Sequence, residues 1–275
     1  MSRRRRRTRS RGGAGIGTIF LISALVIGTI AIVSVFAWLS LTTERRPVLE
    51  AKTLCPVDGP QSLTIVLLDA TDAIPDIARR QLAVYLSDLA GRTPEYGLLE
   101  LRLLDPSNEE GRTVFSKCNP GDGSNLSELV ANPALARKLW NEGFRTPLND
   151  ALEQTLTVGK SDTSPLMETI QRVAVERFEG DKVRDADKQL IVVSDMIENG
   201  PYYSQYRAGV SWDAFKNSTA KQALSADLSG AEVRIKYVVR QGSRFDANRH
   251  VDFWSHWITD NGGKLIEIEK LEGLG

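Results

Sequence analysis

Three short segments of the chain carry the carboxylate and hydroxyl side chains best suited to chemistry. The first, 69–73, reads Asp-Ala-Thr-Asp-Ala and follows the apolar run SLTIVLL. The second is the Thr163-Ser164 pair, which precedes a proline, and the third is Ser194-Asp195, which follows the apolar run QLIVV. Carboxylates and hydroxyls are hard oxygen ligands that suit Mg²⁺, Mn²⁺ or Ca²⁺ better than zinc. If the fold brings these segments together, the sequence predicts an oxygen-lined site for a divalent cation.

The elements that would position these segments alternate between strand-like and helix-like patterns. This alternation predicts an α/β fold with a doubly wound, mostly parallel six-stranded sheet, covered by helices on both faces. Ligands of such sheets bind beyond the carboxyl ends of the strands, where all three segments are expected. The predicted strands are 62–68, 96–104, 113–116, 189–193, 232–239 and 264–268. The predicted helices are 74–89, two within 126–156, 165–178, part of 211–228, and 250–259.

On these residues the chain resembles a von Willebrand factor A-type domain over about 62–270. The metal-ion-dependent adhesion site of that family uses Asp-x-Ser-x-Ser after the first strand, a middle-loop hydroxyl, and an Asp after the fourth strand. The resemblance implies that Asp69, Thr71, Ser164 and Asp195 take these positions and hold Mg²⁺ or another divalent cation. Ala73 stands where the second serine of the motif would be, so the implied site is degenerate. The family fold and a metal-assisted contact with a protein partner are the expectations that follow.

Two alternatives to this ligand set remain open. Thr146-Pro147 and Ser164-Pro165 share one pattern, in which a hydroxyl at the N-cap precedes proline at the first helical position. We prefer Ser164 as the middle-loop ligand because its helix leads directly to the strand 189–193, and Thr146 is the fallback. The competing structural interpretation is that Asp69 and Asp195 only end buried strands while the hydroxyls cap helices.

The amino-terminal region indicates a membrane anchor. Residues 16–41 are almost wholly apolar and exceed the roughly 20 residues that a helix needs to cross a bilayer. The run is also too long for a cleavable signal peptide, and no convincing cleavage site follows it. Seven arginines lie within residues 1–11. The positive-inside rule therefore keeps the amino terminus in the cytoplasm and exports the rest.

The predicted organisation is a cytoplasmic tail (1–15), a transmembrane helix (16–41), a linker (42–61) and the α/β domain (62–275), with a helical insertion at 126–158. We favour a single-pass protein of the bacterial inner membrane with a periplasmic domain. The glycosylation patterns at Asn125 and Asn217 leave a eukaryotic secretory protein open. Ala24 and Gly28 form a small-xxx-small pair, which makes a weak case for self-association of the helix.

The only two cysteines, Cys55 and Cys118, both lie in the exported part, where disulfides persist. A bridge between them is expected, and closing that loop is worth roughly 3–4 kcal/mol of stability. So small a number of cysteines and histidines excludes a zinc module and a disulfide-dense miniprotein.

The function predicted from the sequence is a non-catalytic protein-interaction module, part of an envelope complex and exposed outside the cytoplasmic membrane. Residues 12–275 carry 28 basic and 35 acidic groups, which argues against nucleic acid as a partner of the exported domain. The alternative is a metal-dependent phosphohydrolase of haloacid-dehalogenase type, whose motif also opens with an Asp after the first strand. That motif has a second Asp two positions later, where this chain has Thr71.

Overall fold

The computed structural model describes residues 15–42, 46–105, 108–126, 132–155, 161–240 and 245–271. The Arg-rich tail, part of the predicted linker and the ends of the predicted insertion lie outside these ranges. The chain forms two compact units, Met1–Arg46 and Pro47–Gly275.

The first unit contains one long helix, α1 (Ile16–Thr42), whose 27 residues include no charged side chain. Within it, Gly17–Trp38 is long and apolar enough to cross a membrane, and no other helix among the described residues meets that test. Ala24 and Gly28 both lie in this helix, and a Cβ added at Gly28 would meet no atom within 4 Å. Self-association through this pair stays a prediction.

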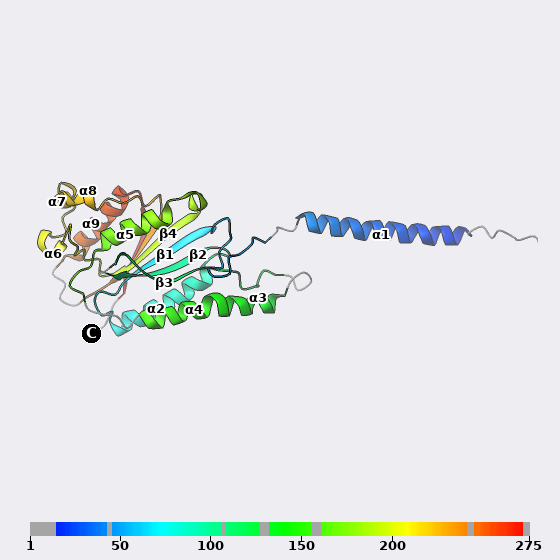
Figure 1. Ribbon diagram of the computed structural model, residues 1–275, viewed down its shortest axis with the longest axis horizontal. Helices are drawn as coiled ribbons and strands as arrows, with labels where there is room; N and C mark the ends of the chain where they lie inside the picture. Colours follow the sequence, from blue (N-terminus) through cyan, green and yellow to red (C-terminus); the bar gives the residue numbers. More distant parts are fainter. Residues whose placement is uncertain are drawn as a thin grey trace, which may run out of the picture. The chain divides into compact units, whose positions relative to one another are not determined.

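The second unit is built on one six-stranded sheet with the order β3-β2-β1-β4-β5-β6 (Figure 1). The pairings β1–β2, β1–β4, β4–β5 and β5–β6 are parallel, and β2–β3 is antiparallel. The predicted mostly parallel, six-stranded α/β fold is therefore confirmed. The strands are β1 (Ser62–Asp69), β2 (Leu98–Asp105), β3 (Asn108–Cys118), β4 (Asp187–Ser194), β5 (Glu232–Val238) and β6 (Lys264–Leu271).

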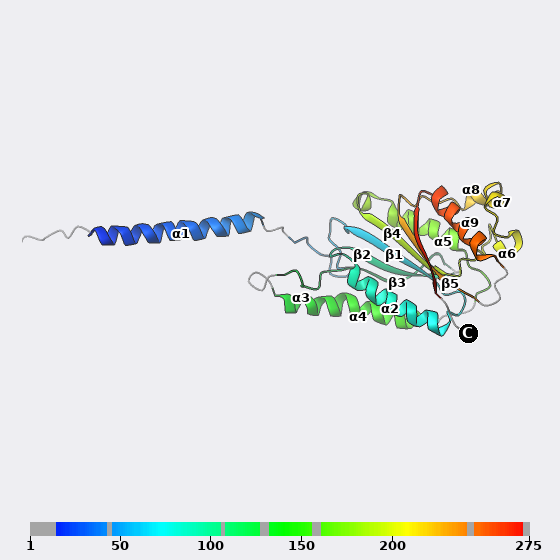
Figure 2. The same ribbon diagram turned by 180° about the vertical axis from the view of Figure 1, so that it is seen from behind.

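Helices cover both faces of the sheet, as the views from the front and from behind show (Figures 1 and 2). One face carries α2 (Asp76–Arg92), α3 (Pro133–Trp140), the π-helical turn η1 (Asn141–Arg145) and α4 (Thr146–Thr155). The other carries α5 (Leu166–Val173), the π-helical turn η2 (Ala174–Phe178), α7 (Trp212–Lys216), α8 (Ala220–Ala223) and α9 (Ala247–Asp260). The short elements η3 (Asp181–Val183) and α6 (Gln205–Ala208) lie in connections.

Strand β1 shows why its sequence is a continuous apolar run. Leu63, Ile65 and Leu67 pack into the core beneath α5 and α9, whereas Val66 and Leu68 pack into the core beneath α2 and α4. Successive side chains of a strand point to opposite faces, so a strand covered on both sides is apolar at every position. This burial places Asp69, the last residue of β1, at the carboxyl edge of the sheet.

One sequence prediction about local structure was wrong in detail. The predicted strand 113–116 is only the middle of β3, which begins at Asn108 and ends at Cys118. The two helices predicted within 126–156 are α3 and α4, which η1 joins into one continuous helical run over residues 133–155. The Thr146 amide donates to the Asn141 carbonyl across this wide turn, so Thr146 continues a helix and caps none.

The predicted disulfide is confirmed. Cys55 and Cys118 are bonded, and no free cysteine is present in the chain. The bridge joins the segment before β1 to the end of β3, where the Cys118 amide also donates to the Thr53 carbonyl at 2.8 Å.

Candidate functional site

The centre of the site is the carboxylate of Asp69, which is 3% exposed and accepts four hydrogen bonds. Its Oδ1 accepts from the Thr71 amide at 3.1 Å and from the Thr71 hydroxyl at 2.6 Å. Its Oδ2 accepts from the hydroxyls of Ser164 at 3.1 Å and Ser194 at 2.6 Å. We call Asp69, Thr71, Ser164 and Ser194 the aspartate cluster. Segments that lie up to 125 positions apart in sequence are thus joined by one side chain.

Ser164 reaches Asp69 because a short backbone pairing holds its loop in place. The Ser164 amide donates to the Asn199 carbonyl at 3.0 Å, and the Asn199 amide donates back at 2.9 Å. The competing interpretation, that Ser164 only caps the following helix, does not hold, since α5 begins after Pro165 without a side-chain cap. The Ser164 hydroxyl is free for Asp69 because the carboxylate of Glu198 accepts from the Met167 amide at 2.8 Å instead.

Glu198 is only 1% exposed, and its burial is the main reason why its pKa rises to about 8. The nearby carboxylates of Glu168 and Asp69 raise that pKa further, while the amide bonds from the start of α5 lower it. At neutral pH the side chain is therefore mostly protonated. Glu198 is a structural acid that anchors the loop before α5, and sequence analysis did not single it out.

Asp195 lies beside the aspartate cluster, but its hydrogen bonds are with other residues than Asp69. Its Oδ1 accepts from the Ile197 amide at 3.0 Å, and its Oδ2 accepts from Nε of Arg240 at 2.5 Å. Burial raises the pKa of Asp195 and the Asp69 carboxylate raises it further, while the Ile197 amide and the Arg240 guanidinium lower it. Arg240 is thus the cation that faces this buried carboxylate.

Arg240 also connects the loop after β4 to the loop after β1. Its Nη1 donates to the Ala73 carbonyl at 3.0 Å, and its Nη2 lies 3.8 Å from Oδ2 of Asp72. Ser194 belongs to one of the three segments predicted to line the site but not to the implied ligand set, and Arg240 was not predicted at all. The position of Ser194 at the end of a buried strand was a signal for it, whereas no pattern in the sequence indicates that Arg240 meets Asp195.

The structure brings together three of the four predicted ligands, namely Asp69, Thr71 and Ser164, with Asp195 adjacent. The fallback residue Thr146 lies in α4 and supplies none of the hydrogen bonds that Asp69 accepts. The two histidines do not form a metal pair, because His250 is buried while His256 is exposed. Burial lowers the pKa of His250 to about 4, so it is neutral at physiological pH.

The predicted divalent cation fits one half of this arrangement and not the other. The hydroxyl oxygens around Asp69 are hard donors of the kind that Mg²⁺ takes. On the other half, Oδ2 of Asp195 faces an arginine, and Ala73 offers no side-chain oxygen. As arranged, these residues do not form a ready divalent site.

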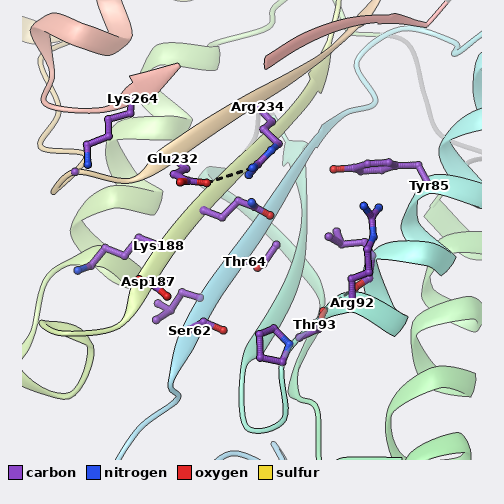
Figure 3. Close-up of a pocket in the computed structure, with 15 residues that line it drawn as sticks. Ser62, Thr64, Tyr85, Arg92, Thr93, Asp187, Lys188, Glu232, Arg234 and Lys264 are labelled. Atoms are coloured by element: carbon purple, nitrogen blue, oxygen red, sulfur yellow. Dashed lines mark hydrogen bonds and ion pairs between the residues drawn. The ribbon is translucent and has the colours of Figure 1, made fainter. Parts of the chain in front are cut away.

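A separate cavity of about 510 Å³ opens at the other, amino-terminal end of the strands (Figure 3). Tyr85 and Arg92 of α2 face Arg234 of β5 across it, and Thr64 of β1 also lines it. Two polar atoms that line it, Oγ of Ser62 and Nη1 of Arg234, are buried without a hydrogen-bond partner among the described residues. Because β1 runs from Ser62 to Asp69, the cavity and the aspartate cluster lie at opposite ends of one strand.

No protein-family model and no curated protein matches the chain. Among solved structures, it is similar to the conserved hypothetical protein BatB from Bacteroides thetaiotaomicron, at 10% identity and a TM-score of 0.40, covering 77% of this chain and 90% of that one. It is also similar to an aerotolerance-related membrane protein from Bacteroides fragilis, a variant with multiple mutations to serines, at 10% identity and a TM-score of 0.35. This match covers 77% of this chain and 92% of that one.

A third similar structure is a von Willebrand factor type A protein from Catenulispora acidiphila, at 9% identity and a TM-score of 0.38. The match covers 78% of this chain and 39% of that one. A protein of the type predicted from the sequence is therefore among the similar structures. Likenesses of this size identify neither a function nor a ligand.

Proposed function

We propose that the chain is a membrane-anchored, non-catalytic interaction module, exposed outside the cytoplasmic membrane as part of an envelope complex. In this proposal α1 anchors the protein, and the face at the carboxyl ends of β1 and β4 binds a partner protein. We call this surface the Asp69 face: the aspartate cluster together with the exposed residues of its loops, Asp72, Asp162 and Thr163.

The observation that carries the proposal is the state of the Asp69 carboxylate. Both of its oxygens accept two hydrogen bonds, and three of the four donors are hydroxyls. A carboxylate held in this way joins three loops into one rigid surface, and rigid placement of contact residues is what a binding site requires. The exposed side chains next to it are then presented to a partner in fixed positions.

The same geometry disfavours the phosphohydrolase alternative. A nucleophilic carboxylate needs a free oxygen directed at its substrate, and a general acid at position 71 would need a titratable side chain. Here the residue at position 71 is a threonine whose amide and hydroxyl both donate to Asp69. Asp69 therefore acts as a hydrogen-bond acceptor that shapes loops.

The location outside the cytoplasm rests on two features of the chain. The arginines before α1 favour a cytoplasmic amino terminus, because positive charge close to a membrane span is retained inside. The Cys55–Cys118 disulfide lies on the opposite side of the span in sequence, and such bonds persist in oxidising compartments. Both features agree with an exported α/β domain.

The test is quantitative capture of partners by the full-length chain from its native membranes. We compare the wild type with Asp72→Lys, which reverses a charge on the Asp69 face at a side chain that is 52% exposed. Asp88→Lys is the matched control. Asp88 is an exposed aspartate of α2, so its substitution makes the same change of charge away from the Asp69 face.

We expect Asp72→Lys to capture much less of the partner than the wild type does, and Asp88→Lys to capture as much as the wild type. Both variants should remain folded under the capture conditions, with Asp72→Lys slightly less stable because it loses the ion pair with Arg240. Equal capture by all three folded proteins would contradict the proposal.

A further inference from the structure

We propose that the guanidinium of Arg240, and not a divalent metal ion, is the resident cation of the Asp69 face. The inference deepens the proposed function, because it states how the surface that binds the partner is held together. It concerns the assembly of the site itself, so it can be tested without the partner.

The first step is the position of the guanidinium. Nε of Arg240 donates to Oδ2 of Asp195, and Nη1 donates to the Ala73 carbonyl at 3.0 Å. These contacts join the loop after β4 to the loop after β1. Within the implied ligand set, they fall on the late aspartate and on the position that lacks its hydroxyl. One side chain therefore contacts both the late aspartate and the backbone of the position that lacks its hydroxyl.

The second step is charge. Asp69 and Asp195 are only 3% and 7% exposed. Two carboxylates buried side by side are costly unless a positive charge or several hydrogen-bond donors compensate them. Asp69 has its four donors, and Asp195 has the Arg240 guanidinium. Hydrogen-bond donors around one carboxylate and a guanidinium beside the other thus compensate for the burial of both.

The third step is competition. A divalent ion bound between these carboxylates would have to displace an arginine that is already hydrogen-bonded on two sides. Arg240 is 25% exposed at its side chain, so the loops around it hold most of the group in place. Lysine could supply the same charge at this position, but it lacks the planar arrangement of donors that contacts Asp195 and Ala73 together.

The experiment is thermal unfolding of the full-length protein in detergent, with millimolar Mg²⁺ or Mn²⁺ and with a chelator. We expect the unfolding temperature of the wild type to be the same in all three conditions. This measurement needs no variant, so it remains informative if a substitution prevents folding.

Variants then test Arg240 directly. Removing a partner from a buried ion pair leaves an uncompensated charge, so Arg240→Gln should lower the unfolding temperature by on the order of 5 °C. Arg240→Lys should recover part of the loss. In the Asp195→Asn background, Arg240→Gln should cost clearly less, since no charge is left unpaired. Arg184→Gln is the control, because it breaks an exposed pair with Asp181 and should change little.

Two results would overturn the inference. One is stabilisation of the wild type by Mg²⁺ or Mn²⁺ that the chelator reverses. The other is an Arg240→Gln variant no less stable than Arg184→Gln. Neither result involves a partner, so a failure here is distinct from a failure of partner capture by the Asp72→Lys comparison.

Discussion

The hydroxyl of Ser194 lies 2.6 Å from Oδ2 of Asp69, and both residues end neighbouring parallel strands. Strands β1 and β4 are paired up to Leu68 and Val193, so the two side chains meet directly beyond the last paired residues. Oγ of Ser194 also accepts from the Met196 amide at 2.8 Å. The loop after β4 is therefore fixed to the end of β1 before any ligand binds.

Ser194→Ala tests this link. The substitution removes one of the hydroxyl donors to a buried carboxylate and leaves the Met196 amide without its acceptor. We expect a loss of about 1–3 kcal/mol in the free energy of unfolding, measured by denaturant titration. Ser255→Ala, at a half-buried position of α9, is the control and should be nearly neutral. A Ser194→Ala protein as stable as this control would show that the link contributes little.

The disulfide should contribute stability by restricting the unfolded chain. Replacing both cysteines, as in Cys55→Ser with Cys118→Ser, should lower the free energy of unfolding by roughly 3–4 kcal/mol. A reductant should destabilise the wild type to a similar degree and leave the double variant unchanged. If the reductant affects both proteins equally, its effect does not come from this bridge.

Glu198 predicts a specific dependence of stability on pH. Its pKa rises on folding from 4.5 to about 8, because burial disfavours the charged form. The folded state therefore retains a proton that the unfolded state has released between these two values. Stability from this group is fully present below pH 4.5 and is lost as the pH rises to about 8.

The measurement for Glu198 is a series of denaturant titrations across that window. Glu198→Gln keeps an oxygen that can accept from the Met167 amide and has no charge to bury. We expect its stability to change less than that of the wild type between pH 4.5 and 8. Parallel pH profiles for the two proteins would contradict the assignment.

The orientation of the anchor can be tested with reporters at the carboxyl terminus. Alkaline phosphatase is active only outside the cytoplasm, so its fusion to the full chain should be active in a bacterial host. Replacing the seven arginines before α1 with glutamine should reduce that activity, because the charge bias that sets orientation is removed. An inactive fusion with intact arginines would place the α/β domain in the cytoplasm.

The central strands could be predicted from the sequence because burial on both faces leaves a simple pattern. β1 and β4 are apolar at consecutive positions, and each ends in a polar residue at the edge of the sheet. β3 was harder to predict. It is antiparallel, lies at the edge of the sheet and has the polar sequence NEEGRTVFSKC, so only its middle looked like a strand.

The proline pattern at Thr146-Pro147 misled the sequence analysis for a local reason. Proline has no amide hydrogen to donate and often marks the first turn of a helix. Here the π-helical turn η1 precedes Pro147, and the helical run continues past this proline although its nitrogen donates no hydrogen bond. Phe144 of this turn packs against Phe115 with 5.6 Å between the ring centroids, a contact that the local pattern of residues does not reveal.

The sequence allowed prediction of those residues of the Asp69 face that lie at the ends of strands. Asp69, Thr71 and Asp195 directly follow recognisable strands, and parallel strands bring their carboxyl ends to one edge. Arg240 lies 45 positions after Asp195, beyond the end of β5. Its contact depends on the path of that connection, which no spacing in the sequence determines.

The most direct test of the central claim is site-specific photocrosslinking in native membranes. A photoreactive residue is placed at position 72 on the Asp69 face or at position 88 on α2, in the otherwise unchanged full-length chain. We predict one discrete crosslinked partner from position 72, retained in the presence of a chelator, and none from position 88. The absence of any adduct from position 72, or the same adducts from both positions, would contradict partner binding by the Asp69 face.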